Sequence, residues 1–581
     1  MWPRCVRDVT RVLARLFFRR FIENDLISPD ADRHQTLAVI TACIISFGIV
    51  VTMILALKYV GGIPTPGEVS WHSLDDKFLY IGWSMAVMAL LTLVEWNALA
   101  LDVRDASILG PLPLEPSTIF IAKAMALVTF AGGTIAVINM MPAIIFSAAM
   151  ISTPLLVAVG FSGYFTLLAM HALTVTAAGA LAFLSVLGVR ELVHALLGTR
   201  LFTRISMILQ AALVVCVVLF LCMLPRMSNH VGQVWLASER PAYVMPPLWF
   251  VGLYEAGAGH VVDNLPRTSV PRRMLPFDRE ATQMYRGREA DFRRLAFLAL
   301  TSLFLAFVVT AAAYTWNNRQ LPPAITAHTN QPHHIRALFV GITERFIVRR
   351  PLVRAGFFFT LQTLWRSSTH RLTMAVVGAV GLAVAALGAR GANVLVIQPT
   401  VLLLLLAGFR HAARVPAELR ANRAFQMCWE GDSGPYVTGV KRAALFSVVA
   451  PALLLMLPLH AALLGWPAAL LHSVFGVLLA NVGLEVAMLG FRTLPFASSY
   501  AGGTNLKGWM PVFFLMVPLT YILAGIERMA LSDPTSGIIW ALVLVAAILV
   551  ARVFERRQRE SYGPVDFYEL PQQTQRLDLT V

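Results

Sequence analysis

Charged residues are scarce in this sequence. Asp, Glu, Lys and Arg together make up 14% of the 581 residues, whereas hydrophobic residues make up 57% and the mean hydropathy is +0.69. In soluble globular domains about a quarter of the residues are charged, so this composition excludes that class. We therefore expect the chain to lie in a membrane.

Paired cysteines and the common nucleotide- and metal-binding motifs are also lacking. The five cysteines are scattered without a C-x-x-C pair, so neither a disulfide framework nor a metal site is indicated (Cys5, Cys43, Cys216, Cys222 and Cys428). No G-x-x-x-x-G-K-[ST] phosphate loop occurs, and the segment 190–198 lacks the H-E-x-x-H order of zinc peptidases. We expect no metal or cofactor on this chain, and no ATPase activity of its own.

Long apolar runs are the dominant feature that is present. A helix that crosses the hydrocarbon core needs about 20 apolar residues, and lipid excludes irregular backbone because its polar groups would find no partner. The sequence therefore predicts an all-α polytopic membrane protein with twelve spans, six in each half, at 37–60, 78–101, 118–150, 163–187, 204–224, 295–315, 372–389, 393–410, 443–464, 467–490, 510–530 and 537–555.

The run from Thr118 to Leu187 has an ambiguous number of crossings. Its length allows two long spans or three short ones, with Pro142 and Pro154 as candidate breaks. Basic residues flank both of its ends, and basic flanks stay on the cytoplasmic side. An even number of crossings, two, is therefore predicted.

The positive residues behind the formal net charge of +15 are concentrated in the loops between the predicted spans. Lys and Arg cluster in every second loop, as the positive-inside rule requires, so both termini are expected in the cytoplasm and nucleic acid is not expected as a partner. The Arg-rich segment 225–294 is an exception that falls outside. Its length permits this, because loops longer than about 60 residues are translocated largely regardless of charge.

The order of segments predicts two related halves, a common plan for transporters. Residues 6–21 and 337–367 each interleave apolar residues with Arg, as helices in the membrane interface do, and each precedes one half. Five segments are expected: an amphipathic N-terminal arm at 1–36, a first transmembrane half at 37–315, a cytoplasmic linker with an interfacial helix at 316–371, a second transmembrane half at 372–555, and a cytoplasmic tail at 556–581.

The segment DVRDASILGPLPLEPSTIFIAK, residues 102–123, is the sharpest motif. Pro111 and Pro113 restrict the backbone on both sides of Leu112 and exclude a regular helix. A helix is expected to restart at Pro116, where proline favours the first helical position. We call residues 102–113 the proline loop. Such a rigid turn with apolar tips suits docking onto another protein, and a simple well-capped turn between two spans is the alternative.

Few ionisable residues lie inside the predicted spans. Burying a charge at mid-bilayer costs about 2.5 to 3.5 kcal/mol on insertion scales, which makes Glu95, Lys123 and Glu485 candidates for function. Glu95 and Lys123 are close enough to the same membrane surface to form an ion pair. The alternative for Lys123 is that its side chain snorkels to the interface. A structural hydrogen bond or ion pair is the alternative for both glutamates, and His171 and His460 are expected to make ordinary polar contacts.

Aromatic residues and prolines gather in the expected outer loop. They make up an outer-loop patch of Tyr243, Pro246, Pro247, Trp249, Phe250 and Tyr254, with Trp235 nearby. Aromatic side chains favour the headgroup zone, so the patch fits a membrane anchor. The alternative is a lid over an extracytoplasmic exit.

The run D-x-x-x-L-x-P-L-P, which begins at Asp105 and is followed by Lys123, resembles the cytoplasmic loop between the second and third spans of large ABC type-2 exporter permeases. YVMPPLWFVGLYEAGAG (243–259), RVPAELRANRAFQM (414–427) and LPFASSY (494–500) are similar to pieces of the same uncharacterised bacterial group. The resemblance is scattered over most of the chain, and its motifs are moderately specific.

This resemblance implies an exporter permease of the bacterial cytoplasmic (inner) membrane. Its partner would be a separate ATP-binding-cassette ATPase, in two copies, which would carry ATP and Mg²⁺. An alternating-access machine receives force at rigid cytoplasmic elements joined to its spans. The residues expected to contact the ATPase are Asp102, Arg104, Asp105, Leu109, Pro111, Leu112 and Pro113 on one surface, and Arg414, Pro416, Glu418, Leu419 and Arg420 on the other. An interfacial helix that only anchors the next span is the alternative for 414–427.

Two other functions stay open. Asp75 and Asp76 are similar to the acidic first loop of lipid-linked glycosyltransferases, in which carboxylates hold a metal or act as a base, although a plain helix start also explains them. A membrane scaffold without transport is the other possibility.

If the chain is a transporter, the scarcity of charge in the spans favours a lipid or another amphiphile as cargo.

Overall fold

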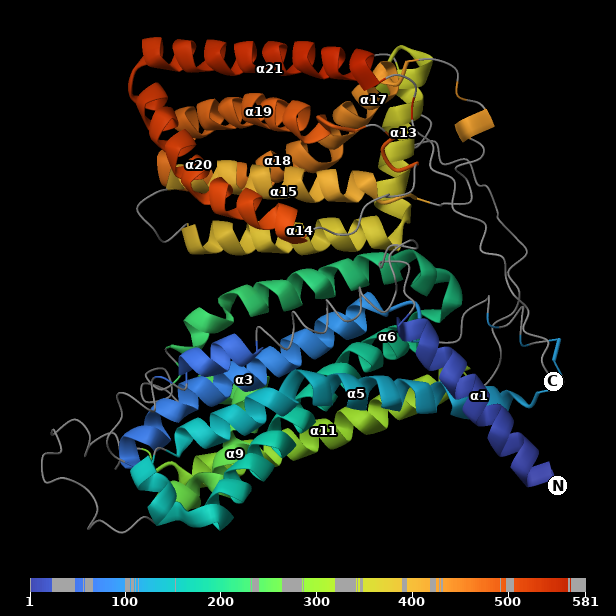
Figure 1. Ribbon diagram of the computed structural model, residues 1–581, viewed down its shortest axis with the longest axis vertical. Helices are drawn as coiled ribbons and strands as arrows, with labels where there is room; N and C mark the ends of the chain where they lie inside the picture. Colours follow the sequence, from blue (N-terminus) through green and yellow to red (C-terminus); the bar gives the residue numbers. More distant parts are fainter. Residues whose placement is uncertain are drawn as a thin grey trace, which may run out of the picture. The chain divides into compact units, whose positions relative to one another are not determined.

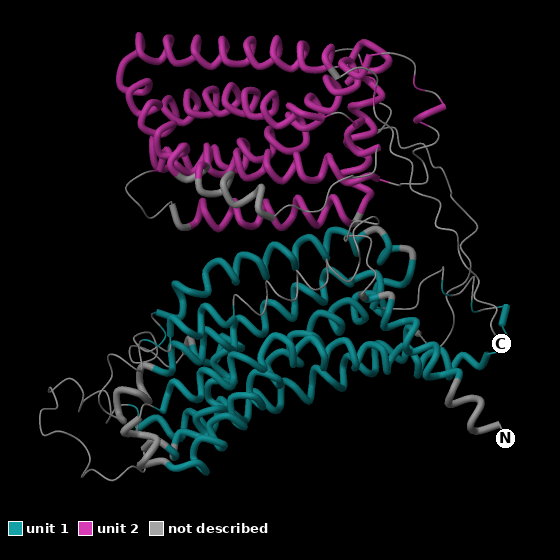
Figure 2. The backbone as a smooth tube through the Cα atoms, in the orientation of Figure 1, with its two compact units in different colours: residues 1–27, 32–327 teal, residues 28–31, 328–581 magenta. Residues whose placement is uncertain are grey.

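The computed structural model is all-α over the residues that it describes and contains no strand there. The chain divides into two compact units (Figure 2): unit 1 comprises Met1–Ile27 and Asp32–Ala327, and unit 2 comprises Ser28–Ala31 and His328–Val581. The boundary lies inside the linker expected at 316–371. The described residues are 2–22, 48–55, 57, 66–99, 105, 109, 111–112, 114–151, 153–229, 231, 240–263, 285, 287–318, 341, 343–344, 348–388, 394–417, 425–427, 429, 432–491, 493–497, 506–562 and 565.

Unit 1 is a bundle in which α3, α9 and α11 pack along α6 (Figure 1). Its helices are α1 (Trp2–Ile22), α3 (Pro66–Val94), α5 (Pro116–Met150), α6 (Thr153–Ser228), α8 (Arg240–Val244), α9 (Pro246–Asp263) and α11 (Glu289–Asn318). The core contains Phe78, Phe250 and Leu295, all completely buried. Two glycines with positive φ, Gly160 and Gly198, break α6 into separate helical segments.

Unit 2 is a second bundle, and α13 runs across the ends of its long helices (Figure 1). Its elements are α13 (Pro351–Arg366), α14 (Ser368–Gly388), η2 (Val394–Val396), α15 (Ile397–Arg414), α17 (Gly434–Ala444), the π-helical turn η4 (Leu445–Val449), α18 (Ala450–Leu464), α19 (Trp466–Met488), α20 (Leu506–Ser532) and α21 (Pro534–Tyr562). Leu402, Phe409 and Val440 are completely buried at its centre.

Ten helices in the described part of the chain are long and apolar enough to cross a membrane. They are Ser73–Val94, Pro116–Met150, Gly160–Thr199, Ile205–Ser228, Glu289–Asn317, Thr369–Ala386, Val394–Arg414, Gly434–Leu464, Trp466–Met488 and Pro534–Ser561. Each corresponds to one predicted span, and the run 118–187 forms two helices as predicted, with Pro142 inside α5. Of the other two predicted spans, 37–60 lies mostly outside the described residues and 510–530 lies within α20. Twelve spans and cytoplasmic termini therefore stay predictions.

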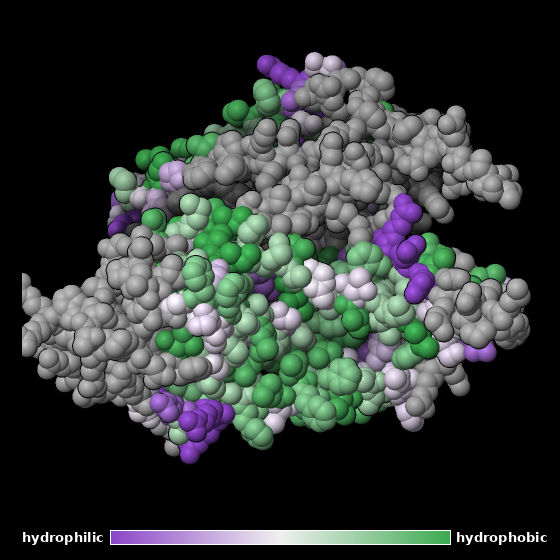
Figure 3. Space-filling model, turned by 60° about the horizontal axis from the view of Figure 1, so that its bottom comes forward, coloured by the Kyte–Doolittle hydropathy of each residue, from purple (hydrophilic) through white to green (hydrophobic). Residues whose placement is uncertain are grey.

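Large hydrophobic side chains cover much of the outer surface of these helices. Phe297, Phe304 and Leu305 on α11 are each more than 60% exposed, as are Leu542 and Val550 on α21. One face of the molecule carries a broad hydrophobic area (Figure 3). A soluble protein rarely exposes apolar patches of this extent, whereas lipid tails solvate them. This supports a multi-pass membrane protein.

The predicted amphipathic arm is a helix, α1. Its buried face, with Leu13, Phe17 and Phe21, packs against α5, whereas Val12 and Leu16 remain exposed. The second part of the other predicted interfacial helix is α13, which begins at Pro351, because proline has no N–H to donate and favours the first position of a helix. Most of 337–347 lies outside the described residues.

Two segments that the sequence indicated as loops are helical. α3 begins at Pro66, so Asp75, Asp76 and Lys77 lie inside a helix, and the interpretation of the two aspartates as a helix start is wrong. Within the expected outer loop 225–294, residues 246–263 form α9, which packs on α3, α6 and α11. Pro246 and Pro247 are thus not loop residues, because they occupy the first turn of this helix, where proline is tolerated.

Candidate functional site

The described part of the proline loop is a tight turn with an exposed apolar tip. Leu112 N–H donates to Leu109 O (3.1 Å), and Leu114 N–H donates to Leu112 O (2.7 Å). Pro111 is exposed and Leu112 is 47% exposed. As predicted, α5 restarts at Pro116, directly after the extended residue Glu115. Asp102, Arg104 and Pro113 lie outside the described residues.

The base of the proline loop is buried close to two charged residues of α6 and a tyrosine of α11. Asp105 is only 7% exposed, and Asp105, Arg190 and Glu191 all lie within electrostatic range of the Tyr314 hydroxyl. Arg190 pairs with Glu191, whose carboxylate also accepts a hydrogen bond from Asn317 Nδ2 (2.8 Å). The loop therefore has an exposed apolar tip and a buried base that lies near α6 and α11.

The second predicted contact surface begins at the end of α15, and its backbone is fixed by the turn 494–497. Ala417 N–H donates to Phe496 O, and Phe496 N–H donates to Ala413 O, both at 2.8 Å. Phe496 is completely buried and has a φ of +63°, a strained conformation for a phenylalanine that persists only where the surroundings impose it. Segments 414–427 and 494–500, which share the sequence resemblance, therefore meet in space.

Two of the predicted contact residues are held at this surface. The Arg414 guanidinium lies over the ring of Phe491, 5.7 Å from its centroid, and Pro416 is half-buried. His370 Nε2 lies 3.0 Å from Val415 O, which ties the segment to the start of α14. Glu418, Leu419 and Arg420 lie outside the described residues.

A polar cavity of about 1140 Å³ opens at the basic end of unit 2. We define this basic end by the end of α13, the start of α14, the end of α15, the last turn of α17 and the end of α21. These elements carry Arg366, Arg371, Arg410, Arg414, Lys441, Arg442, Arg552, Arg556 and Arg559. The charged residues that line the basic cavity are Arg349, Arg350, Asp432, Lys441, Arg442, Glu485, Arg552, Glu555, Arg556, Arg559 and Glu560.

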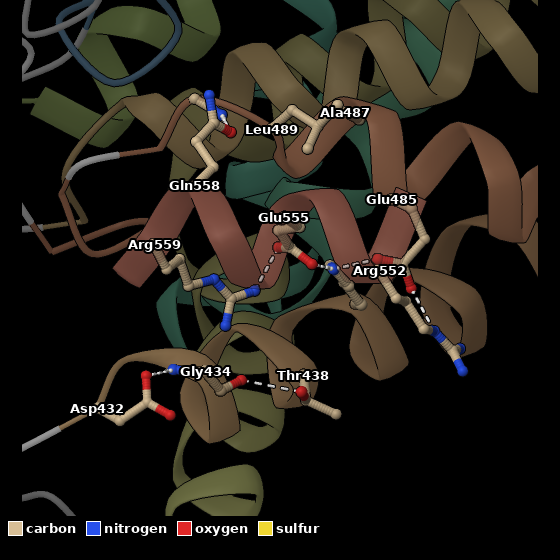
Figure 4. Close-up of polar contacts among 12 residues, drawn as sticks. Asp432, Gly434, Thr438, Glu485, Ala487, Leu489, Arg552, Glu555, Gln558 and Arg559 are labelled. Atoms are coloured by element: carbon tan, nitrogen blue, oxygen red, sulfur yellow. Dashed lines mark hydrogen bonds and ion pairs between the residues drawn. The ribbon is translucent and has the colours of Figure 1, made fainter. Parts of the chain in front are cut away.

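The floor of the basic cavity is a buried network of ion pairs (Figure 4). Lys441 bridges the carboxylates of Glu485 and Glu555. Arg552 Nε lies 2.9 Å from Glu485, and Arg559 pairs with Glu555. The interpretation of Glu485 as an ion-pair residue is therefore confirmed. Sequence reasoning missed Lys441 and Glu555, because they are 114 residues apart and no local spacing links them.

The other intramembrane candidates have different surroundings. Lys123 is completely buried beneath α1, with its Nζ 4.6 Å from the ring centroid of Phe17 and 5.2 Å from that of Phe21. Lys123 therefore makes cation–π contacts, and the snorkelling interpretation is wrong. Glu95 is buried just after α3. Its pairing with Lys123 stays a prediction.

Most of the outer-loop patch lies in the interior of unit 1. Phe250 and Tyr254 are completely buried, so they are core residues rather than membrane anchors. Pro247 is also buried and Pro246 is half-buried. Tyr243 and Trp249 are likewise partly exposed, and Trp249 Nε1 donates to Tyr243 O (3.0 Å).

Next to this patch lies a buried ion pair that sequence reasoning missed. Lys77 of α3 pairs with Glu255 of α9, and the two side chains are 3% and 1% exposed. The Lys77 Nζ also lies 4.2 Å from the ring centroid of Tyr254, and the Tyr285 hydroxyl donates to Glu255. The only signal in the sequence was that Lys77 and Glu255 are isolated charges beside apolar residues, which suggests that each needs a partner of opposite charge.

The two histidines have fewer polar contacts than expected. Neither ring nitrogen of His460 has a hydrogen-bond partner among the described residues, and the same holds for His171 Nε2. The His460 ring lies edge-on to His472, with the centroids 4.6 Å apart, and His472 Nδ1 contacts Glu527. The interpretation of His460 as a hydrogen-bonded core residue is therefore not supported.

Comparison with known proteins identifies no relative of this chain. No protein-family model, curated protein or solved structure matches it. The proline loop, the end of α15 and the basic cavity are therefore the features that indicate what this chain does.

Proposed function

We propose that this chain is the membrane-spanning permease of an ATP-driven exporter whose ATPase is a separate protein. The proposal includes twelve spans, both termini in the cytoplasm, and a location in the bacterial cytoplasmic membrane. The observation that carries it is the form of the proline loop, in which Leu112 is exposed at the tip and Asp105 is buried at the base.

This form suits the transmission of force. An exposed apolar tip contributes binding energy when a partner covers it. The buried base lies near Arg190 and Glu191 of α6 and Tyr314 of α11, so a displacement of the loop would act on those two helices. A push on Leu112 would therefore reach two long helices, rather than being absorbed by a flexible linker.

The second surface supports the same function. The backbone hydrogen bonds that hold residues 413–417 and the strained Phe496 make the end of α15 rigid as well. Unit 1 and unit 2 thus each present one fixed element that follows or precedes a candidate span. Two such elements in one chain fit a partner present in two copies.

An integral-membrane glycosyltransferase that uses Asp75 and Asp76 is the alternative. The structure gives it less support, because both residues lie inside α3 and Asp76 is only 5% exposed. A catalytic carboxylate must come within hydrogen-bond reach of its substrate.

A substitution at the tip of the proline loop tests the proposal. We expect that the tagged chain, purified from its native membrane, brings an ATPase with it, and that Leu112→Asp reduces the recovered ATPase at least about tenfold, because an unpaired charge would replace an apolar contact in the interface. Glu115→Gln, at an exposed position three residues away, is the matched control and should leave recovery unchanged.

Two outcomes contradict the proposal. If no ATPase copurifies with the wild-type chain and vesicles show no ATP-dependent flux, the chain acts as a scaffold. If Asp75→Asn abolishes activity while Leu112→Asp does not change it, the enzymatic alternative is correct.

A further inference from the structure

The basic cavity has an excess of positive charge that its own carboxylates do not neutralise. Among the described residues, seven basic and four acidic side chains line it, which leaves three positive charges in excess there. Glu485 and Glu555 are already engaged by Lys441, Arg552 and Arg559. Arg350 is exposed and makes no ion pair among the described residues, and Arg556 contacts only the exposed Glu560 there, at 3.1 Å. The cavity therefore favours an anion.

The arrangement of these cations suits a phosphate group. Arginine binds phosphate through a planar fork of N–H donors. The buried ion pairs hold Lys441 and Arg559 at the floor, while the side chains of Arg552 and Arg556 are 58% and 84% exposed and can approach a ligand from the rim. The N-terminus of α17, at Gly434, also lines the cavity, but its N–H already donates to Asp432 Oδ1 (2.8 Å), so the side-chain cations provide the positive charge.

The surface next to the cavity indicates where the phosphate comes from. Arg552 and Arg556 lie on α21, and the same helix exposes Leu542, Leu549, Val550 and Val553, each by more than half. An acyl chain that lies along these residues would end beside the cavity. At about 1140 Å³ the cavity is also much larger than a single inorganic anion requires.

We propose that the basic cavity binds the phosphate headgroup of an anionic phospholipid, with the acyl chains on the exposed face of α21. Basic pockets between membrane helices on the cytoplasmic side recognise such headgroups. This binding site does not depend on the exporter proposal. A lipid can occupy it whether or not an ATPase docks on the proline loop.

A titration of the full-length chain with lipid tests this site. The purified protein in zwitterionic phosphatidylcholine nanodiscs is exchanged into discs with increasing phosphatidylglycerol, and bound lipid is counted by native mass spectrometry. We expect Arg350→Gln/Arg556→Gln to weaken binding roughly 25-fold, because each cation near an anionic headgroup contributes about a factor of five. The control, Arg293→Gln/Arg294→Gln, removes two exposed arginines of α11 and should leave binding unchanged.

Two outcomes overturn the proposal, and one control shows that the variant is folded. Equal loss of binding in both double variants would show a general charge effect without a site. Binding of inorganic phosphate with the same variant dependence, but no selective binding of phosphatidylglycerol, would assign the cavity to a soluble phosphate compound. An unchanged unfolding temperature of Arg350→Gln/Arg556→Gln in phosphatidylcholine confirms that the variant is folded, so its loss of binding is informative.

Discussion

Replacing Lys77 by methionine is expected to destabilise unit 1 by about 3–5 kcal/mol, because it leaves the carboxylate of Glu255 buried without its cation. Tyr285 still donates a hydrogen bond to that carboxylate, but it does not neutralise the charge. The free energy of unfolding is measured by denaturant titration in detergent micelles. A large decrease would show that this ion pair holds α3 and α9 together.

A second substitution distinguishes a lost attraction from an unpaired charge. Lys77→Met/Glu255→Gln removes both charges and should recover most of the lost stability, since apolar or neutral replacements of a buried ion pair are often well tolerated. Arg293→Gln, which removes the cation of an exposed pair with Glu289, should cost less than about 1 kcal/mol. If Lys77→Met is no more harmful than Arg293→Gln, the buried pair has no structural importance.

Adding a single methyl group at Gly439 is expected to destabilise unit 2 by about 3 kcal/mol. A Cβ atom there would lie 2.8 Å from Phe357 N and closer still to Val353 O, so the obstruction is the backbone of α13. Backbone cannot rotate away as a side chain can, and overpacking typically costs about 1–3 kcal/mol. Gly439→Ala should therefore separate α13 from α17, which thermal unfolding in detergent detects as a lower midpoint.

A matched substitution at a glycine with free space around it is expected to raise stability instead of lowering it. Gly378 lies within α14, and a Cβ atom there would meet nothing within 4 Å. Gly378→Ala should stabilise the protein slightly, because alanine loses less backbone entropy than glycine when a helix forms. If the two alanine variants unfold at the same temperature, α13 does not cross α17 closely at Gly439.

The elements that could be predicted from the sequence depend on local patterns. Ten spans follow from the length of their apolar runs, and the division of residues 118–187 into two helices follows from the basic residues at both ends. The start of α5 follows from Pro116, whose missing N–H costs nothing at the first helical position. In the same way, the prolines of the proline loop indicate the turn at Pro111 and Leu112.

The contacts that could not be predicted join residues far apart in the chain. Lys77 meets Glu255 and Lys441 meets Glu555 because helices pack side by side, and neither pair leaves a local spacing to recognise. Helix α9 was missed because Pro246 and Pro247 mark a loop as readily as a helix start. The close crossing at Gly439 depends on the path of α13, which no periodicity in the sequence reveals.

The location of the proline loop tests the account most directly. The Leu112→Cys substitution, introduced into a chain whose native cysteines are replaced by serine, supplies a single thiol for a maleimide that does not cross membranes. We predict no labelling in intact cells and strong labelling in inside-out vesicles, because the tip is exposed and the proposed topology puts it on the cytoplasmic side. Labelling of the Leu112→Cys variant in intact cells would place the loop on the outer side, where no ATPase could reach it, and would contradict the account.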